Sequence, residues 1–209
     1  SLARSSGISR SLIAERGVKV VSQMKDLKAL LLNSPRIKDK DFAHLAGMKL
    51  KILGMPEQAR TDVGLTHYLA ATLPATRLNL RGWKITGASV KELARLTGLT
   101  YLELGWTHVG DNGLHHLAGL PALTTLVLEG SKVTDAGMKD LAKVKSLKRL
   151  FLEYTGVTPA GVKELAGMGL EHLTVPEKSR TDEGLQPYAA ALAPGQALDL
   201  RNWDITDAG

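Results

Sequence analysis

Leucines recur along the chain in one short pattern: leucine, two residues, leucine, one residue and leucine. The central leucines of its successive copies are Leu30, Leu53, Leu78, Leu102, Leu126, Leu150, Leu173 and Leu198. The steps between them are 23, 25, 24, 24, 24, 23 and 25 residues. A nearly constant period of this length is typical of a solenoid built from one structural repeat after another.

Each repeat is predicted to hold a short strand followed by a helix. Leu126 and its neighbouring leucine alternate with Thr125 and Val127, which is the period of a half-buried strand with its leucines pointing inward. In residues 133–142, Thr134 is a suitable residue to begin a helix, and apolar residues then recur at helical spacing. Every period of the pattern therefore supplies one strand and one helix.

One repeat alone buries too little apolar surface to be stable, so neighbouring repeats are expected to stack. Stacking places a parallel sheet on one face, a row of short helices on the other face and a continuous leucine core between them. Because helices are bulkier than strands, the stack is expected to curve. The sequence thus predicts an α/β right-handed solenoid with its sheet on the concave face and its helices on the convex face.

The leucine pattern and the Thr-Asp-x-Gly-hydrophobic-x-x-Leu-Ala stretch at residues 134–142 together resemble the leucine-rich repeat. They are most similar to the cysteine-containing subclass and to related bacterial arrays, and the resemblance covers roughly residues 12–209. The ninth position of each repeat departs from the Cys or Asn of that subclass. Here that position is held by Pro35, a residue at or next to Gln58, Trp83, Thr107, Ser131, Thr155, a residue at or next to Lys178, and Trp203.

A longer period overlies the short one, because residues 27–89 match residues 147–209 at an offset of 120 residues. The array is therefore interpreted as a duplicated block of five repeats. We expect a single solenoid fragment over residues 1–209, with about eight repeats, a degenerate first repeat at residues 3–26 and a truncated last repeat at residues 195–209. Neither end carries an evident polar capping repeat, so the parent protein is expected to be longer.

Composition changes this picture little. The chain has no cysteine, which excludes disulfides and thiolate metal clusters and leaves the compartment undetermined. Its formal charge of +6 would suit an anionic partner, but charges of both signs are interleaved along the chain, so nucleic acid is a disfavoured partner. No apolar run approaches the about 20 residues of a membrane helix.

No catalytic site, metal site or cofactor is predicted. His108, His115 and His116 are interpreted as surface residues, because neighbouring histidines on a helix diverge and no third ligand lies at a useful spacing. A column formed by Glu103, Glu129 and Glu153 superficially resembles the acid pair of a glycosidase. Arginines expected on the same face favour a mixed-charge recognition surface instead.

The outward positions of the central strands are the predicted partner-binding site, since these residues take no part in the core. Four of the chain's nine aromatic residues fall there, and aromatic and arginine side chains dominate binding hot spots. The predicted partner-binding residues are Arg77, Asn79, Arg81, Tyr101, Glu103, Trp106, Val127, Glu129, Arg149, Phe151, Glu153 and Tyr154. A structural role for the aromatic residues, as strand formers or as packing on the turns, is the alternative interpretation.

Two arginines break the pattern of the repeat. Arg60 and Arg180 stand at a slot that other repeats fill with isoleucine or valine, and an arginine there needs a partner if it is buried. Either the backbone is re-routed near Pro56 and Pro176, or each arginine reaches a glutamate close in sequence. Trp83 and Trp203 are expected to fill space between turns.

These features predict a non-enzymatic module that binds a protein or peptide through a concave strand face. The alternative hypothesis is the recognition or scaffold arm of an enzyme, such as a ubiquitin ligase or a bacterial effector, whose catalytic domain lies outside these residues. That alternative rests on likeness of fold, which does not determine function.

Overall fold

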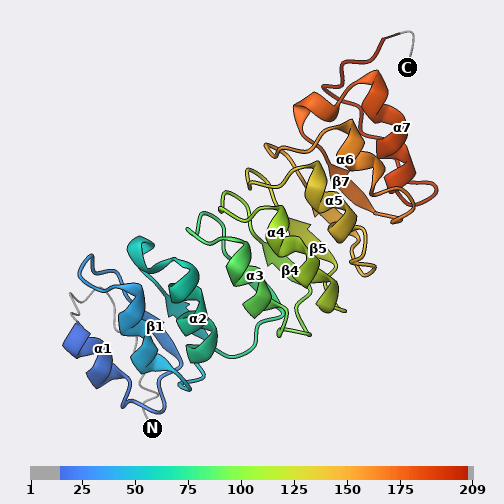
Figure 1. Ribbon diagram of the computed structural model, residues 1–209. Helices are drawn as coiled ribbons and strands as arrows, with labels where there is room; N and C mark the ends of the chain where they lie inside the picture. Colours follow the sequence, from blue (N-terminus) through green and yellow to red (C-terminus); the bar gives the residue numbers. More distant parts are fainter. Residues whose placement is uncertain (1–14, 207–209) are drawn as a thin grey trace. The chain divides into compact units, whose positions relative to one another are not determined.

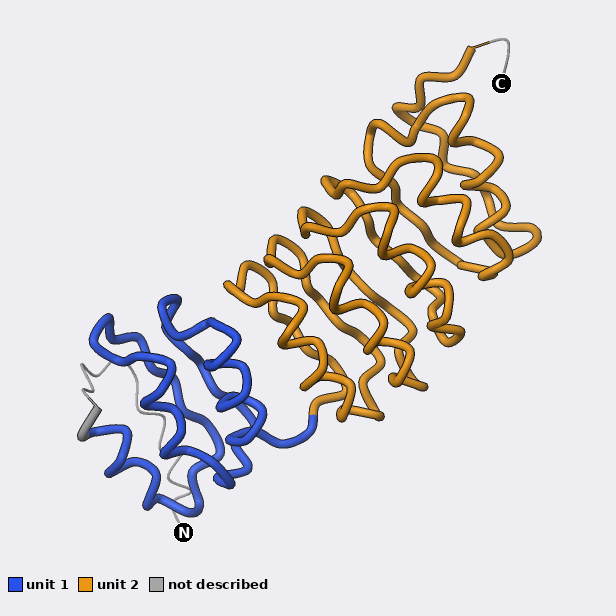
Figure 2. Tube along the Cα trace, in the orientation of Figure 1, with its two compact units in different colours: residues 1–74 blue, residues 75–209 orange. Residues whose placement is uncertain are grey.

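The computed structural model describes residues 15–206, so the predicted repeat at residues 3–26 is described only from Glu15 onward. The chain divides into two compact units, residues 1–74 and residues 75–209 (Figure 2). Whether the repeats form one uninterrupted array over the whole chain stays a prediction.

Unit 1 contains two parallel strands, β1 (Ala29–Leu31) and β2 (Ile52–Gly54), with Leu30 opposite Leu53. Its helical elements are α1 (Glu15–Val21), the 3-10 helices η1 (Asp39–Leu45) and η2 (Glu57–Ala59), and α2 (Asp62–Ala71).

Unit 2 contains five parallel strands in chain order, with one leucine of each strand in register across the sheet. The strands are β3 (Arg77–Asn79), β4 (Tyr101–Glu103), β5 (Thr125–Val127), β6 (Arg149–Phe151) and β7 (His172–Thr174). The α-helices are α3 (Gly87–Leu93), α4 (Asp111–Leu114), α5 (Asp135–Leu141), α6 (Pro159–Lys163) and α7 (Asp182–Ala191). The 3-10 helices are η3 (His115–Gly119) and η4 (Glu177–Ser179).

The helices of unit 2 form a row on one side of its sheet (Figure 1). This alternation of parallel strands and short helices confirms the predicted α/β solenoid fold. Its core is made by the inward leucines: Leu102, Leu126 and Leu150 are fully buried between the strands and the helices. Burial of each such side chain contributes about 1.5–3 kcal/mol, which explains why the pattern of leucines determines the fold.

The Thr-Asp pair at the start of the helices has two tasks. The Thr134 hydroxyl accepts a hydrogen bond from the amide of Ala136, which caps helix α5. The Asp111 carboxylate of the preceding repeat accepts hydrogen bonds from the Thr134 amide at 2.8 Å and from its hydroxyl at 2.7 Å. Asp135 binds Thr158 of the next repeat in the same way. The pair therefore ties neighbouring repeats together at the helix side.

The ninth position of the repeat holds buried hydroxyls at the centre of unit 2. The Thr107 hydroxyl donates to the carbonyl of Leu104 at 2.7 Å, and the Thr155 hydroxyl donates to that of Leu152 at 2.7 Å. Ser131 lies buried between these two repeats, and its hydroxyl has no hydrogen-bond partner among the described residues. Here each threonine satisfies a carbonyl of its own repeat, in place of a ladder of identical side chains between repeats.

Strand pairing ends at β7 within the described residues. The strand predicted around Leu198 is not formed, and the Leu198 side chain is 45% exposed. The reason lies on β7, whose outer edge is already occupied by side chains. The Tyr188 hydroxyl donates to the carbonyl of Leu173 at 3.3 Å, and Nε of Arg180 donates to the carbonyl of Val175 at 3.1 Å.

Among residues 15–206, no helix is both long enough and apolar enough to span a membrane.

Candidate partner-binding face

The predicted partner-binding residues all lie in unit 2, on strands β3–β6 or on the turns that follow them. The sheet register arranges the outward residues in two rows that run across the strands. The first row is Arg77, Tyr101, Thr125, Arg149 and His172. The second row is Asn79, Glu103, Val127, Phe151 and Thr174. The structure therefore brings the predicted strand residues together on one sheet face.

Two of the predicted residues are covered by their neighbours. Glu103 is 7% exposed and Val127 is 8% exposed, although both point away from the leucine core. The Glu103 carboxylate accepts hydrogen bonds from the amide of Gly105 at 2.8 Å and from the Tyr101 hydroxyl at 3.3 Å. Glu103 therefore holds neighbouring residues of the face through these hydrogen bonds and exposes little surface to a partner.

The first row contains close contacts between charged and aromatic side chains. The Arg77 guanidinium lies 4.1 Å from the centre of the Tyr101 ring, which is a cation–π contact. The Phe151 and His172 rings lie 4.9 Å apart between their centres. Partial burial is the main cause that raises the pKa of Tyr101 above its ordinary value, and the Glu103 carboxylate adds to this rise.

Arg81, Glu129 and Trp106 form a network at the end of the strands. Nη1 of Arg81 lies 2.9 Å from a Glu129 carboxylate oxygen, and the Arg81 guanidinium lies 6.0 Å from the centre of the Trp106 ring. The hydrogen bond from Arg81 is the main cause that lowers the pKa of Glu129, and a hydrogen bond from the Trp106 side chain lowers it further. The charges on this part of the face therefore neutralise each other.

One slot on the turns after the strands has a left-handed backbone in four successive repeats of unit 2. It holds Gly82 (φ 70°), Trp106 (φ 56°), Gly130 (φ 64°) and Tyr154 (φ 57°). Glycine adopts this conformation freely, whereas a residue with a Cβ atom pays about 1–2 kcal/mol. The two aromatic residues therefore occupy positions where the backbone favours glycine.

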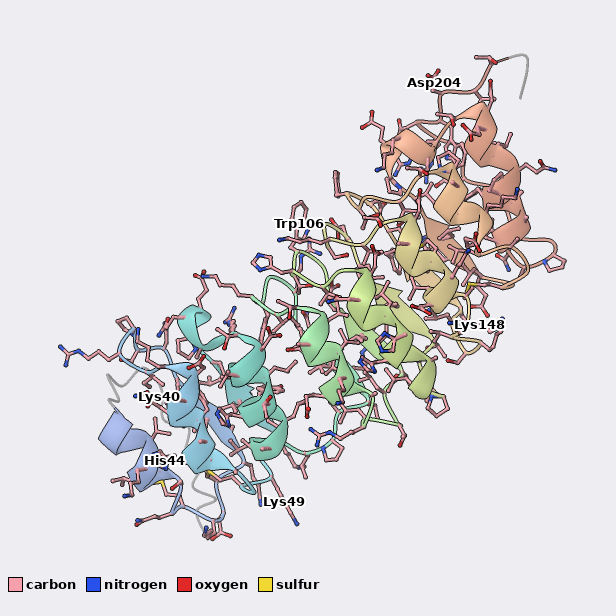
Figure 3. The ribbon with its side chains drawn as sticks, in the orientation of Figure 1. Lys40, His44, Lys49, Trp106, Lys148 and Asp204 are labelled. Carbon is pink, nitrogen blue, oxygen red and sulfur yellow. The ribbon has the colours of Figure 1, made fainter. Side chains whose placement is uncertain are left out.

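The two aromatic side chains meet across the glycine that separates them. A Cβ atom on Gly130 would lie 2.6 Å from Cδ2 of Trp106, so the indole fills the space that a side chain would take. The Trp106 and Tyr154 ring centres are 5.8 Å apart. We call Trp106, Gly130 and Tyr154 the aromatic ridge. Its rings are 50% exposed at Trp106 and 72% exposed at Tyr154, and Trp106 projects from the loop edge of unit 2 (Figure 3).

A pocket of about 490 Å³ borders the ridge on the side of Tyr154. Its lining residues are Glu153, Tyr154, Pro176, Glu177, Lys178 and Arg180. The Glu153 carboxylate accepts a hydrogen bond from the Thr174 hydroxyl at 2.5 Å and lies 3.8 Å from Nη2 of Arg180. Sequence reasoning placed Glu153 and Tyr154 here, and it did not find this pocket, because Pro176 and Glu177 belong to the next repeat.

The two irregular arginines are hydrogen-bonded to backbone carbonyls. Nε of Arg60 donates to the carbonyl of Met55 at 3.0 Å, and Arg180 makes the same bond with Val175. Each arginine thus bonds back to the end of the preceding strand. The expectation for the tryptophans fits their positions: Trp83 is buried, and the Trp203 ring lies 5.0 Å from that of Tyr188 between ring centres.

A family model described as Leucine Rich repeat matches residues 96–118 and 120–142. No curated protein matches the chain. The matched segments contain strands β4 and β5 with Trp106 of the ridge. The match and the parallel sheet identify the fold as an α/β leucine-rich-repeat solenoid. Leucine-rich repeats generally mediate contacts between proteins, and they are typically non-catalytic modules.

Proposed function

We propose that this chain is a protein-interaction module whose partner binds the sheet face of unit 2, with the aromatic ridge as the centre of the contact. The face supplies aromatic and arginine side chains, the residue types that dominate binding hot spots. Positive and negative side chains on it pair with each other, as Arg81 does with Glu129. This balance favours a protein partner over a nucleic acid, which needs an excess of positive charge.

The observation that carries the proposal is the conformation of the ridge. Trp106 and Tyr154 keep large exposed rings on backbone that favours glycine, at slots where the other repeats have Gly82 and Gly130. Strained residues of this kind cluster at functional sites. Exposure of two aromatic rings gives the isolated chain little stability in return, so binding to a partner is the reason that we propose for them.

Substitution by glycine tests the proposal, because it separates stability from binding. Tyr154→Gly removes the exposed ring and the left-handed strain together, so we expect the chain to be as stable as the unmodified chain, or more stable by up to about 1 kcal/mol. Trp106→Gly relieves the same strain and loses the packing of the indole on Gly130. The double variant should no longer capture the partner from a lysate of the source cells, as measured by affinity capture and mass spectrometry.

Lys49→Gly is the matched control. Lys49 also has a left-handed backbone, with φ 56°, and it lies in unit 1, which contains none of the proposed partner-binding residues. Its variant should gain stability in the same way and should still capture the partner. Retention of the partner by a folded double variant of Trp106 and Tyr154 contradicts the proposal, and so does capture of no protein by the unmodified chain.

The same face would serve a chain that is the recognition arm of an enzyme, and the proteins captured with it would reveal that role. Assignment to the cysteine-containing-like subclass, with bacterial relatives, also stays a proposal. Its support is that Thr107 and Thr155 place buried polar side chains at the ninth position of the repeat.

A further inference from the structure

The sheet face contains two contacts in which an arginine of the chain lies near an aromatic ring. Arg77 lies 4.1 Å from the Tyr101 ring centre, and Arg81 lies 6.0 Å from that of Trp106. Arg81 is also paired with Glu129. An arginine held between an aromatic ring and a carboxylate is therefore an arrangement that this face already uses, because the planar guanidinium satisfies both groups at once.

Tyr154 has the ring and the carboxylates of this arrangement and lacks the arginine. Arg81 precedes Trp106 by 25 residues, and the residue that precedes Tyr154 by 25 is Glu129. Within residues 15–206, no arginine or lysine lies over the Tyr154 ring, which is 72% exposed. The residue 25 positions before the aromatic ring is thus a cation for Trp106 and an acid for Tyr154.

The pocket beside Tyr154 contains a carboxylate that can accept a cation. Its two basic groups are already engaged: Nε of Arg180 donates to the carbonyl of Val175, and Nζ of Lys178 donates to that of Gly156 at 2.8 Å. Glu153 is bonded to Thr174. The Glu177 carboxylate makes no hydrogen bond or ion pair with any residue that the structure describes.

We infer that the aromatic ridge recognises an arginine side chain of the protein partner, which stacks on the Tyr154 ring and pairs with Glu177. The inference rests on the proposed function and specifies the partner's chemistry. A guanidinium fits better than an ammonium group, since it stacks flat on a ring and presents several donors in one plane to a carboxylate. Exposure of Tyr154 leaves room for such a side chain to approach from solvent.

A small probe tests the inference without the natural partner. N-acetyl-arginine amide is titrated into the full chain while the indole N–H resonances of Trp83, Trp106 and Trp203 are followed by NMR, after assignment with single tryptophan-to-phenylalanine variants. We expect the Trp106 resonance to shift in a saturable way, with little change at Trp83, which is buried. N-acetyl-citrulline amide has nearly the same shape without the charge, and it should bind at least about fivefold more weakly.

Two variants locate the site. Glu177→Gln should reduce the preference for arginine over citrulline, and Tyr154→Gly should abolish it. Glu171→Gln, at the residue before β7 and outside this pocket, should leave it unchanged. Equal binding of the two probes, no shift of Trp106, or a shift that both site variants retain overturns the inference. If the ridge variants lose the natural partner and arginine still does not bind, the proposed function stands and the arginine assignment fails.

Discussion

Residues 50–72 and residues 170–192 are two copies of one irregular repeat, 120 residues apart, and they end their strands in the same way. In each copy a short strand is followed by a 3-10 helix, an arginine and a ten-residue helix, which is longer than the other α-helices. Arg60 and Arg180 bond to the carbonyls of Met55 and Val175, at 3.0 Å and 3.1 Å. The parallel bridge between Leu50 and Thr72 in the first copy is repeated between Leu170 and Leu192.

The regular repeats of unit 2 behave differently, because each of their strands pairs with a strand on both sides, from β4 to β6. The sheet of unit 1 has β2 at its end, and that of unit 2 has β7 at its end within the described residues. Since β2 and β7 belong to the two copies, each strand ladder ends at a copy of the irregular repeat within the described residues. Backbone groups at a free edge favour unwanted pairing, and side chains that occupy them prevent it.

The largest loss of stability is expected from substitution of the glycines at the start of the long helices, and it tests whether the two copies share the same packing. A Cβ atom on Gly64 would lie 1.7 Å from the carbonyl oxygen of Ala59, and one on Gly184 would lie 1.9 Å from that of Ser179. These contacts are with backbone, which has little freedom to move away. Gly64→Ala and Gly184→Ala should each lower the free energy of unfolding by about 3 kcal/mol or more.

Urea unfolding with hydrogen exchange as the readout measures this effect in each unit. Gly64→Ala should accelerate exchange in residues 1–74, and Gly184→Ala in residues 75–209. Gly98→Ala is the control, because a Cβ atom there would meet nothing within 4 Å. A normal unfolding free energy for one of the two glycine variants would show that the copies do not share this packing.

A smaller effect is expected from the arginines, and here the copies should differ. Arg180→Met keeps the apolar stem and removes both the bond to Val175 and the contact with Glu153 at 3.8 Å. Glu153 lies in the repeat before the second copy, and the residue 120 positions earlier, in the repeat before the first copy, is Asn33, which has no charge. We expect a loss of about 2 kcal/mol for Arg60→Met and a larger loss for Arg180→Met.

Arg201→Met is the control for the arginine variants. Arg201 pairs with Asp199 at 2.6 Å, but its side chain is 86% exposed, and exposed ion pairs contribute little. Its unfolding midpoint in urea should match that of the unmodified chain. Equal losses for Arg60→Met and Arg180→Met would mean that Glu153 does not distinguish the copies.

The sequence was enough to predict the strands of the repeats, but it did not predict where the strand ladders end. The spacing of Leu102, Leu126 and Leu150 was enough to predict the strands, because period and burial follow directly from leucine positions. The ladder ends were not predicted, since they depend on how far the Arg60 and Arg180 side chains reach. The arginines were recognised as irregular, but their carbonyl partners lie five residues back on the strand, and a pattern of residue types does not reveal such a bond.

The candidate site was likewise predicted from the sequence only in part. Alternation along the strands placed Arg77 and Phe151 on the outward face, and the structure agrees. The burial of Glu103 depends on neighbouring strands, so a single strand's pattern did not indicate it. The contact of Trp106 with Tyr154 spans two repeats. Its signal in the sequence was an aromatic residue at a slot that two other repeats of unit 2 fill with glycine.

The smallest effect concerns the tyrosines of the two copies, Tyr68 and Tyr188. The Tyr188 hydroxyl is buried and donates to the carbonyl of Leu173, so Tyr188→Phe leaves that carbonyl without this donor and should cost about 1 kcal/mol at pH 7. Tyr68, the equivalent residue of the first copy, is half-buried, and Tyr68→Phe is the matched comparison. Urea unfolding of both variants measures the difference between the copies.

Alkaline pH distinguishes the hydroxyl of Tyr188 from its ring. Burial, with a smaller contribution from Asp199, raises the pKa of Tyr188 above its ordinary value of 10.0. A folded-state pKa above that of the unfolded chain stabilises the fold fully below about pH 10, and this contribution is lost as the pH rises through the folded-state pKa. The phenylalanine variant has no such group to ionise. The stability difference between the unmodified chain and Tyr188→Phe should therefore shrink above about pH 10, and a constant difference up to pH 11 would mean that the hydroxyl ionises as readily in the folded chain as in the unfolded one.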